Sequence, residues 1–367
     1  MAHTLQERYS DIVLAKLRKE LVLKDGVIFN NDYEGSPKAG AVKIPTRDTE
    51  VSVSDYDKAN GASKSTGATS YTTLAISKDK AVNEVIDGYD AAGVPDNLVA
   101  DRLDSAGYAL ASQVDTDAAQ ALLAGGTNVN VASLTKDNIY SQIVAIRTAM
   151  SKANVPNDGK RYLLVTPDTV ALLLTSPEFI SASSLGDDVK QSGAIGKIAG
   201  FNVFEWNDST ANLAMIAGHP RFATRVNEWS VGVHIQDLNG SGDYIGASAV
   251  QGRLVYDHAV LRATAIRCVY SPSTLGGSLA KATGASDTGK TVVTISSGNT
   301  GTTYAYKVNP TENVAYNTTS TAYAGTSLTS GTTAIAVSAG DVIEVVNFSS
   351  SKAVAVAYFK VTADDIK

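Results

Sequence analysis

One stretch of the sequence matches a chemical motif in full. Residues 284–291 (Gly-Ala-Ser-Asp-Thr-Gly-Lys-Thr) fit the phosphate-loop pattern, in which the N–H groups of a glycine-rich turn surround phosphates and a lysine reaches the outer ones. That geometry needs a buried strand before the loop and a helix after it. Residues 279–283 lack the composition of a buried strand, and the β-branched residues 291–295 predict a strand instead of a helix. Nucleotide binding is therefore a remote alternative.

The other residues able to carry acid–base or metal chemistry are scattered. The four histidines are His3, His219, His234 and His258. None lies at a metal-ligand spacing from another histidine or from the one cysteine, and the nucleophile motif Gly-x-Ser-x-Gly is absent. The adjacent carboxylates at 187–188 and 364–365 point in different directions in most structures, which makes them weak acid–base candidates. The sequence predicts no catalytic residue, no metal site, no cofactor and no enzymatic activity.

Composition limits the class of protein. A chain of 367 residues is long for one domain and sufficient for two, and 44% hydrophobic residues permit a sizeable core. The net charge of −6 argues against a dedicated nucleic-acid binder, although it permits a protein that only encloses nucleic acid. The single cysteine, Cys268, excludes an intramolecular disulfide. A polar N-terminus and the absence of an apolar run of roughly 20 residues predict no signal peptide and no membrane span.

The N-terminal part of the chain contains two segments that need a partner surface. Residues 5–23 have apolar residues at helical spacing among many charges, which indicates an arm with one amphipathic helix; an ordinary first helix fits equally well. Residues 42–76 alternate apolar and polar side chains on both sides of a polar stretch at 55–70, which predicts a long β-hairpin. The hairpin has too few apolar residues to bury a face of its own, so we expect a mobile flap or a loop that lies on a neighbouring subunit.

The clearest helix signal covers residues 96–124. Asp96 is a favourable N-cap, apolar residues recur every three or four positions, and two glycines at 125–126 end the pattern. About 28 residues make a rod of around 40 Å, and we expect it to lie against a sheet. Charged residues, among them Asp115 and Asp117, are expected on its outer face.

The region after this helix mixes helices with strands and is therefore predicted to be α+β. A helix is expected at 134–153, with Ser133 or Thr135 as its cap, and a shorter one at 167–174. The expected strands are residues 161–166, 201–206, 213–217 and 256–269.

Composition changes near Pro272, because Thr, Ser, Gly, Ala and Val then dominate and no arginine follows Arg267. Strand-like runs separated by glycine- and serine-rich turns predict a small all-β domain, a sandwich of about 90 residues, with residues 271–285 as its linker. The runs are residues 292–295, 304–308, 335–337, 342–346 and 354–359.

The order of these elements resembles the major capsid protein of tailed bacteriophages, which has the Hong Kong 97-type fold. Residues 42–76 look like the extended loop of that family, and residues 96–124 look like its spine helix. Residues 162–168 (Tyr-Leu-Leu-Val-Thr-Pro-Asp) and 196–203 (Gly-Lys-Ile-Ala-Gly-Phe-Asn-Val) resemble the strand, helix and returning strand of its axial domain. The resemblance covers residues 1–270 and depends on the ordered combination of these segments.

The resemblance implies an α+β fold of the Hong Kong 97 type with an additional C-terminal domain. Its parts would be an N-terminal arm (1–34), an extended hairpin loop (35–78), peripheral and axial domains that include the spine helix (79–271), and an all-β, immunoglobulin-like domain (276–367). We expect the last domain to protrude from the outer surface of a shell.

The resemblance also implies a structural subunit of a virion, assembled in the host cytoplasm. Pentamers and hexamers would close an icosahedral shell around double-stranded DNA, without sequence-specific binding of that DNA. A separate scaffolding protein and a portal are expected partners, and a cement or decoration protein is a further candidate. Some family members crosslink a lysine to an asparagine; Lys58, Asn60 and Lys64 lie in the loop, where solubility is their default role. A phage tail or fibre protein is the alternative, but it should lack so long a helix.

Overall fold

The computed structural model describes most of the chain. The described residues are 18–37, 40–46, 51–64, 70–93, 98–177, 196–239, 242, 244–297 and 302–367. The chain divides into two compact units: unit 1 comprises Met1–Gly125 and His219–Ala263, and unit 2 comprises Gly126–Gly218 and Thr264–Lys367. Within the described ranges, no helix has both the length and the apolar character needed to cross a membrane.

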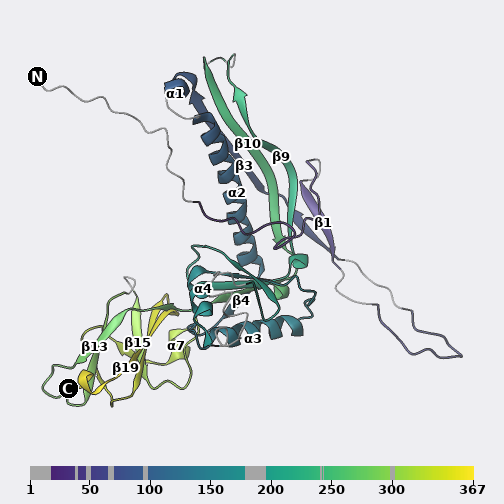
Figure 1. Cartoon of the computed structure of the whole chain (residues 1–367). Coiled ribbons are helices and arrows are strands. Elements are labelled where there is room, and N and C mark those ends of the chain that lie inside the picture. The colour runs from purple at the N-terminus through teal and green to yellow at the C-terminus, as the bar shows by residue number, and fades with distance from the viewer. Residues whose placement is uncertain are drawn as a thin grey trace, which may run out of the picture. The chain divides into compact units, whose positions relative to one another are not determined.

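Unit 1 is built on one long helix that lies along an antiparallel sheet (Figure 1). Its main elements are helix α2 (Leu98–Gly125) and, in sheet order, β3 (Lys78–Asp87), β10 (Ala247–Val260) and β9 (Ala223–Asp237). Ile86, Ala106 and Val250 are buried between helix and sheet. At Gly252 a Cβ atom would lie 3.0 Å from Leu110 Cδ1, so the missing side chain lets the helix approach β10 closely.

The spine helix predicted at 96–124 is confirmed as α2, although Asp96, its predicted N-cap, lies outside the described residues. The single strand predicted at 256–269 is wrong. Strand β10 ends at Val260, a 3-10 turn η2 (Ala263–Ala265) follows, and β11 (Arg267–Tyr270) belongs to unit 2.

The pairing of the long strands β9 and β10 contains two irregularities, which make the strand pattern difficult to recognise in the sequence. Their pairing register shifts between Gln251 and Arg253 and again between Val255 and Tyr256. At each shift β9 contains one more residue than β10, so the two-residue period of β9 is interrupted, while β10 pairs with β3 without a shift.

The base of the predicted hairpin is confirmed. Strand β1 (Ala41–Thr46) pairs antiparallel with β2 (Ser70–Ala75) along its whole length. Short pieces complete unit 1: α1 (Gly88–Gly93) and the 3-10 turn η1 (Pro220–Phe222). The amphipathic helix predicted at 5–23 falls mainly outside the described residues, and residues 18–23 are not helical, so the prediction is wrong for that end.

Unit 2 begins with a six-stranded mixed sheet and two helices. In order the strands are β4 (Thr127–Asn130), β11, β8 (Leu213–Gly218), β5 (Tyr162–Val165), β7 (Phe201–Glu205) and β6 (Lys197–Ile198). The helices are α3 (Ile139–Lys152) and α4 (Pro167–Leu174). Every residue of β5 and β8 is buried, and so is Cys268 of β11, which has an exposed fraction of 0%. The predicted mixture of helices and strands is confirmed.

Helix α3 begins later than the predicted position 134. Asn138 is its N-cap, and the Asn138 side chain accepts a hydrogen bond from Thr135 N and donates one to Ser133 O. These bonds close a turn ahead of the helix, so Ser133 and Thr135 belong to that turn and the predicted caps are wrong. The predicted apolar face of the helix is buried as expected.

The last part of unit 2 contains two packed sheets. The larger has the order β12 (Ser273–Thr274), β19 (Lys352–Lys360), β18 (Val342–Ser349), β15 (Thr303–Val308) and β16 (Thr326–Leu328). The smaller has β13 (Gly277–Lys281), β14 (Lys290–Ile295) and β17 (Ala334–Ala336), and two short helical pieces are α7 (Ser320–Tyr323) and η3 (Ala363–Asp365).

The two sheets face each other, because one hydrophobic cluster includes Val293 of β14 together with Ile343 and Val345 of β18. The strand runs predicted after residue 290 are confirmed. The linker predicted at 271–285 is wrong, since this stretch contains β12 and β13.

Candidate functional site

The candidate phosphate loop at 284–291 is the turn between β13 and β14. Asp287 holds it together: its Oδ2 accepts from Gly284 N and its Oδ1 accepts from Lys290 Nζ, each at 3.0 Å. Lys290 is the first residue of a strand, and Thr291 Oγ1 donates to Ala280 O. The loop is therefore followed by a strand, and it lacks the helix N-terminus with which a phosphate loop holds its anion.

The three histidines in the described ranges serve local structure. His219 Nδ1 accepts from Arg221 N, and the exposed His234 contacts Gly232 O through Nδ1. The buried His258 Nε2 accepts from Arg225 Nε at 2.9 Å. Within the part of the chain that the structure describes, no three His, Cys, Asp or Glu residues are grouped closely enough to hold a metal ion.

The two pairs of adjacent carboxylates have different outcomes. Residues 187–188 lie outside the described residues. Asp365 caps the C-terminal turn η3, where its Oδ2 accepts from Thr362 N at 2.9 Å. The carboxylate is thus engaged in a capping box, which is a structural use.

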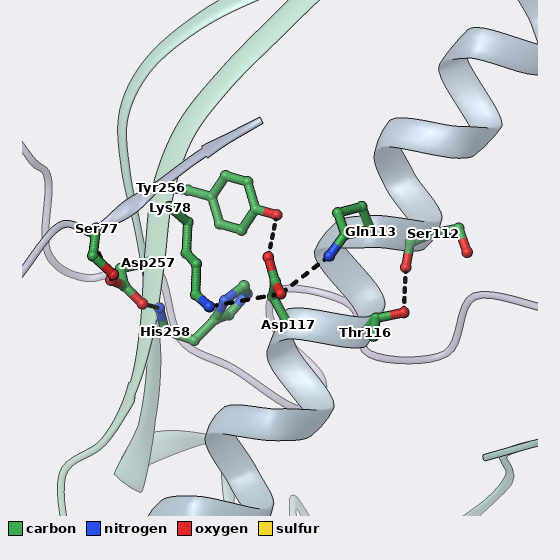
Figure 2. A network of polar contacts seen from close by, with 9 residues as sticks. All are labelled: Ser77, Lys78, Ser112, Gln113, Thr116, Asp117, Tyr256, Asp257 and His258. Carbon is green, nitrogen blue, oxygen red and sulfur yellow. Dashed lines mark hydrogen bonds and ion pairs between the residues drawn. The ribbon is translucent and has the colours of Figure 1, made fainter. Parts of the chain in front are cut away.

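A network of polar side chains lies between α2 and the sheet of unit 1 (Figure 2). Asp117 of α2 is only 4% exposed. Its Oδ2 accepts from Tyr256 Oη at 2.9 Å, its Oδ1 accepts from Gln113 Nε2 at 3.1 Å, and Lys78 Nζ lies 3.8 Å from Oδ1. The carboxylate therefore ties the helix to β3 and to β10 at the same point.

Next to this network, Asp257 and His258 extend the polar contacts along β10. Asp257 Oδ2 accepts from both the backbone N and the hydroxyl of Ser77 at 2.9 Å. The ring of His258 lies edge-on to those of Tyr256 and Phe29, with centroid distances of 5.5 and 5.1 Å. These contacts fix the start of β3 and the end of β10 against the helix.

Burial sets the protonation of this network. Desolvation lowers the pKa of His258 to about 4, and the neighbouring Arg225 cation acts in the same direction, so the imidazole is neutral at physiological pH. Desolvation also raises the pKa of Tyr256, and the hydrogen bond to Asp117 acts in the same direction. The site is suited to holding helix and sheet together, and its groups are already engaged with one another.

The expected position of Asp115 and Asp117 on the outer face of the helix is wrong, since both are buried. Asp117 precedes Ala118 and follows Val114 by three residues, so it lies within the apolar stripe of the helix. The position of Asp117 within this stripe is the sequence signal that could have indicated its burial. An isolated carboxylate in such a stripe indicates a buried partner, because burying an unpaired charge is costly.

The hairpin presents apolar side chains to solvent. Val51 is 80% exposed, Val53 is 98% exposed and Tyr56 is 74% exposed. The turn beside them is ordered by Asp57, whose carboxylate accepts from Ala59 N and from Asn60 Nδ2, each at 2.8 Å. The described part of the hairpin thus exposes three large apolar side chains just before this turn.

Comparison with solved structures identifies the fold. A chain from Mycobacterium phage Che8 aligns with a TM-score of 0.62 and 24% identity, over 72% of this chain and 96% of that chain. The capsid of the cyanophage P-SCSP1u gives a TM-score of 0.62 at 14% identity, over 72% and 92%. The mature capsid of bacteriophage PhiM1 gives 0.59 at 13% identity, over 73% and 92%. No curated protein sequence matches the chain.

The fold is therefore that of bacteriophage capsid proteins. The chain belongs to the phage capsid protein family, whose model matches residues 83–269, just over half of its length. Within that family it is a major capsid protein, a structural subunit of the multi-subunit capsid of the virion.

Proposed function

We propose that this subunit has a Hong Kong 97-type fold and assembles into pentamers and hexamers that close an icosahedral shell around double-stranded DNA. The main support is the hairpin, because it exposes Val51, Val53 and Tyr56 beside a turn that is ordered by its own hydrogen bonds. Around the axis of a pentamer or hexamer, each subunit contacts its two neighbours through two different surfaces. A hairpin of this kind supplies one of those surfaces. The net charge of −6 is compatible with a capsid that encloses DNA without binding it tightly.

Deleting the hairpin tip tests this proposal. Replacement of residues 51–64 by a short glycine–serine linker should leave the two units folded, because nearly all of the deleted residues are exposed and β1–β2 pairing is retained. Closed shells should disappear or become much less stable in negative-stain electron microscopy of the expressed protein, with its scaffold where one is needed. A matched control replaces only Lys58 and Lys64 by serine, which keeps the apolar residues. Normal shells from the deletion variant would contradict the proposal.

We further propose that residues 276–367 form an immunoglobulin-like domain on the outer surface, beyond the core that builds the shell. In support, the solved structures are covered over 92–96% of their own length but leave about a quarter of this chain unmatched, which is close to the size of that domain. The proposed partners are a separate scaffolding protein, a portal and a cement or decoration protein. We infer no catalytic residue, metal or cofactor for this subunit.

Truncation after Ser271 tests the boundary of this domain. The shorter chain should fold and still form shells, because every strand of the six-stranded sheet ends by residue 270. We expect a loss of about 1–3 kcal/mol in the stability of unit 2, since the Asn212 side chain loses its bond to Val354 O and Tyr270 loses its stacking on Tyr316. Circular dichroism melting and electron microscopy give the readouts. Insoluble or unfolded truncated protein would refute the boundary.

A further inference from the structure

The turn of the hairpin contains a chemically labile pair, Asn60–Gly61. Asparagine is among the thermolabile residues of proteins, and a following glycine makes it more so, because no Cβ atom hinders the approach of the glycine nitrogen to the asparagine side chain. The chain contains one other such pair, Asn239–Gly240. Residues 51–60 are all exposed, so water reaches Asn60 directly from solvent.

Loss of the Asn60 amide needs no reagent except water. The Gly61 backbone nitrogen gives up its proton and attacks Asn60 Cγ, so that an N–Cγ bond forms. The Cγ–Nδ2 bond then breaks, and Nδ2 leaves as ammonia with a proton taken from solvent. Water opens the resulting cyclic succinimide at either carbonyl carbon, which leaves aspartate or isoaspartate at position 60. The reaction exchanges a neutral amide for a carboxylate, and nothing is oxidised or reduced.

In the closed turn both reacting groups are engaged with Asp57. Gly61 N donates to Asp57 O at 2.7 Å and Asp57 N donates to Gly61 O at 3.2 Å, so the two residues form an antiparallel bridge. Asn60 Nδ2 donates to Asp57 Oδ2 at 2.8 Å. The attacking nitrogen therefore keeps its proton in one hydrogen bond, while the amide that must leave is held in another.

The charge of Asp57 also opposes the reaction. The hydrogen bond from Ala59 N, followed by that from Asn60, lowers the pKa of Asp57, so its carboxylate is ionised at neutral pH. Removal of the proton from Gly61 N creates a second negative charge in the same turn, and a nearby like charge disfavours it. Gly61 has a φ of +77°, which glycine adopts without strain, so the closed turn is a relaxed conformation.

We propose that Asn60 is a deamidation site that Asp57 holds in check, and that loss of the amide opens the turn permanently. The new carboxylate at position 60 has no N–H group to donate to Asp57, and it repels the charge of Asp57. In the isoaspartate product the backbone runs through the former side chain and becomes longer, so the Asp57–Gly61 bridge loses its register. The chemistry belongs to the single chain, so it stands independently of the proposed shell geometry.

Peptide mass mapping of the full-length, unassembled protein, stored in mildly alkaline buffer, tests the first step. Asn60 should be converted to a mixture of aspartate and isoaspartate, which chromatography separates. Asp57→Ala should raise the rate of conversion by roughly fivefold to tenfold, because it removes two hydrogen bonds to a charged acceptor together with the repelling charge. Asp55→Ala is the matched control: it removes another exposed carboxylate of the same hairpin, and it should leave the rate unchanged.

Asn239–Gly240 provides an internal reference in the same samples. It lies between β9 and β10, so its conversion should respond to neither variant. The proposal would be overturned by an unchanged rate at Asn60 in Asp57→Ala, or by no conversion at Asn60 in any sample. Equal acceleration by Asp55→Ala, or parallel acceleration at Asn239, would overturn it as well.

Hydrogen exchange tests the second step, the opening of the turn. The amides of Ala59 and Gly61, which donate to Asp57 in the closed turn, should exchange roughly fivefold faster in Asn60→Asp than in the unaltered protein. Asn60→Ala removes the amide donor without adding a charge, and it should show a smaller increase. Unchanged exchange in Asn60→Asp, or an equal increase in the two variants, would refute opening by the new carboxylate.

Discussion

Replacing Asp117 by alanine is expected to lower the free energy of unfolding of unit 1 by about 2–4 kcal/mol. The change leaves the buried Tyr256 hydroxyl without its acceptor and removes the negative charge that Lys78 faces. Helix propensity is not the cause, since alanine favours a helix more than aspartate does. Fluorescence of Trp229 in a Trp206→Phe background follows urea unfolding of unit 1 alone, because the chain contains two tryptophans and the other is in unit 2.

A double-mutant cycle with Tyr256→Phe separates the Asp117–Tyr256 bond from other effects. If the bond carries the loss, Asp117→Ala should cost clearly less in the Tyr256→Phe background than in the unaltered protein. Additive losses would show that the hydrogen bond is not the source of the destabilisation. Asp104→Ala, which removes an exposed carboxylate of the same helix, should stay within about 0.5 kcal/mol of the unaltered protein.

Acidification from pH 7 to pH 4 is expected to destabilise unit 1 by about 3 kcal/mol through His258 alone. Burial lowers the pKa of His258 to about 4 in the folded chain, against an ordinary value of 6.5. The unfolded chain therefore binds a proton at a higher pH than the folded chain does. The contribution of the neutral imidazole is complete above about pH 6.5 and is lost progressively as the pH falls to 4.

Urea unfolding measured at several pH values between 7 and 4 checks this dependence. His258→Gln should flatten the dependence by close to one proton, whereas His234→Gln should leave it unchanged, because His234 is exposed on β9. If His258→Gln kept the full slope, the acid sensitivity would belong to carboxylates elsewhere in the chain. The contrast between the two variants makes the assignment specific to the buried ring.

Much of the fold could be predicted where the signal is local. Helix α2 has an apolar residue every three or four positions and two glycines at its end, and the strands after residue 290 are short β-branched runs between turns. Strand β9 could not be predicted in the same way, since its two bulges interrupt the period. The turn before α3 depends on the side-chain hydrogen bonds of Asn138. Ser, Thr and Asn are all favourable N-caps, so the sequence alone does not show which of Ser133, Thr135 and Asn138 caps the helix.

The candidate site was harder to predict than the fold. Asp115 and Asp117 are charged residues in a helix, and such residues are usually at the surface. Their partners are distant in sequence: Leu23 is 92 residues from Asp115, and Tyr256 is 139 residues from Asp117. Pairing over such separations follows from the packing of helix on sheet and leaves no local pattern. The exposed hairpin, by contrast, could be predicted from the sequence, because one continuous segment contains too few apolar residues to bury a face of its own.

Cys268 can report on the opening of the six-stranded sheet without any mutation. It is the only thiol of the chain, and burial in the six-stranded sheet raises its pKa to about 12. The thiolate, which is the form that reacts with alkylating reagents, is therefore scarce at neutral pH while the sheet is closed. The rate of labelling then measures how often this sheet opens, both in free subunits and in finished particles. The labelling rate of one residue thus compares the motion of unit 2 before and after assembly.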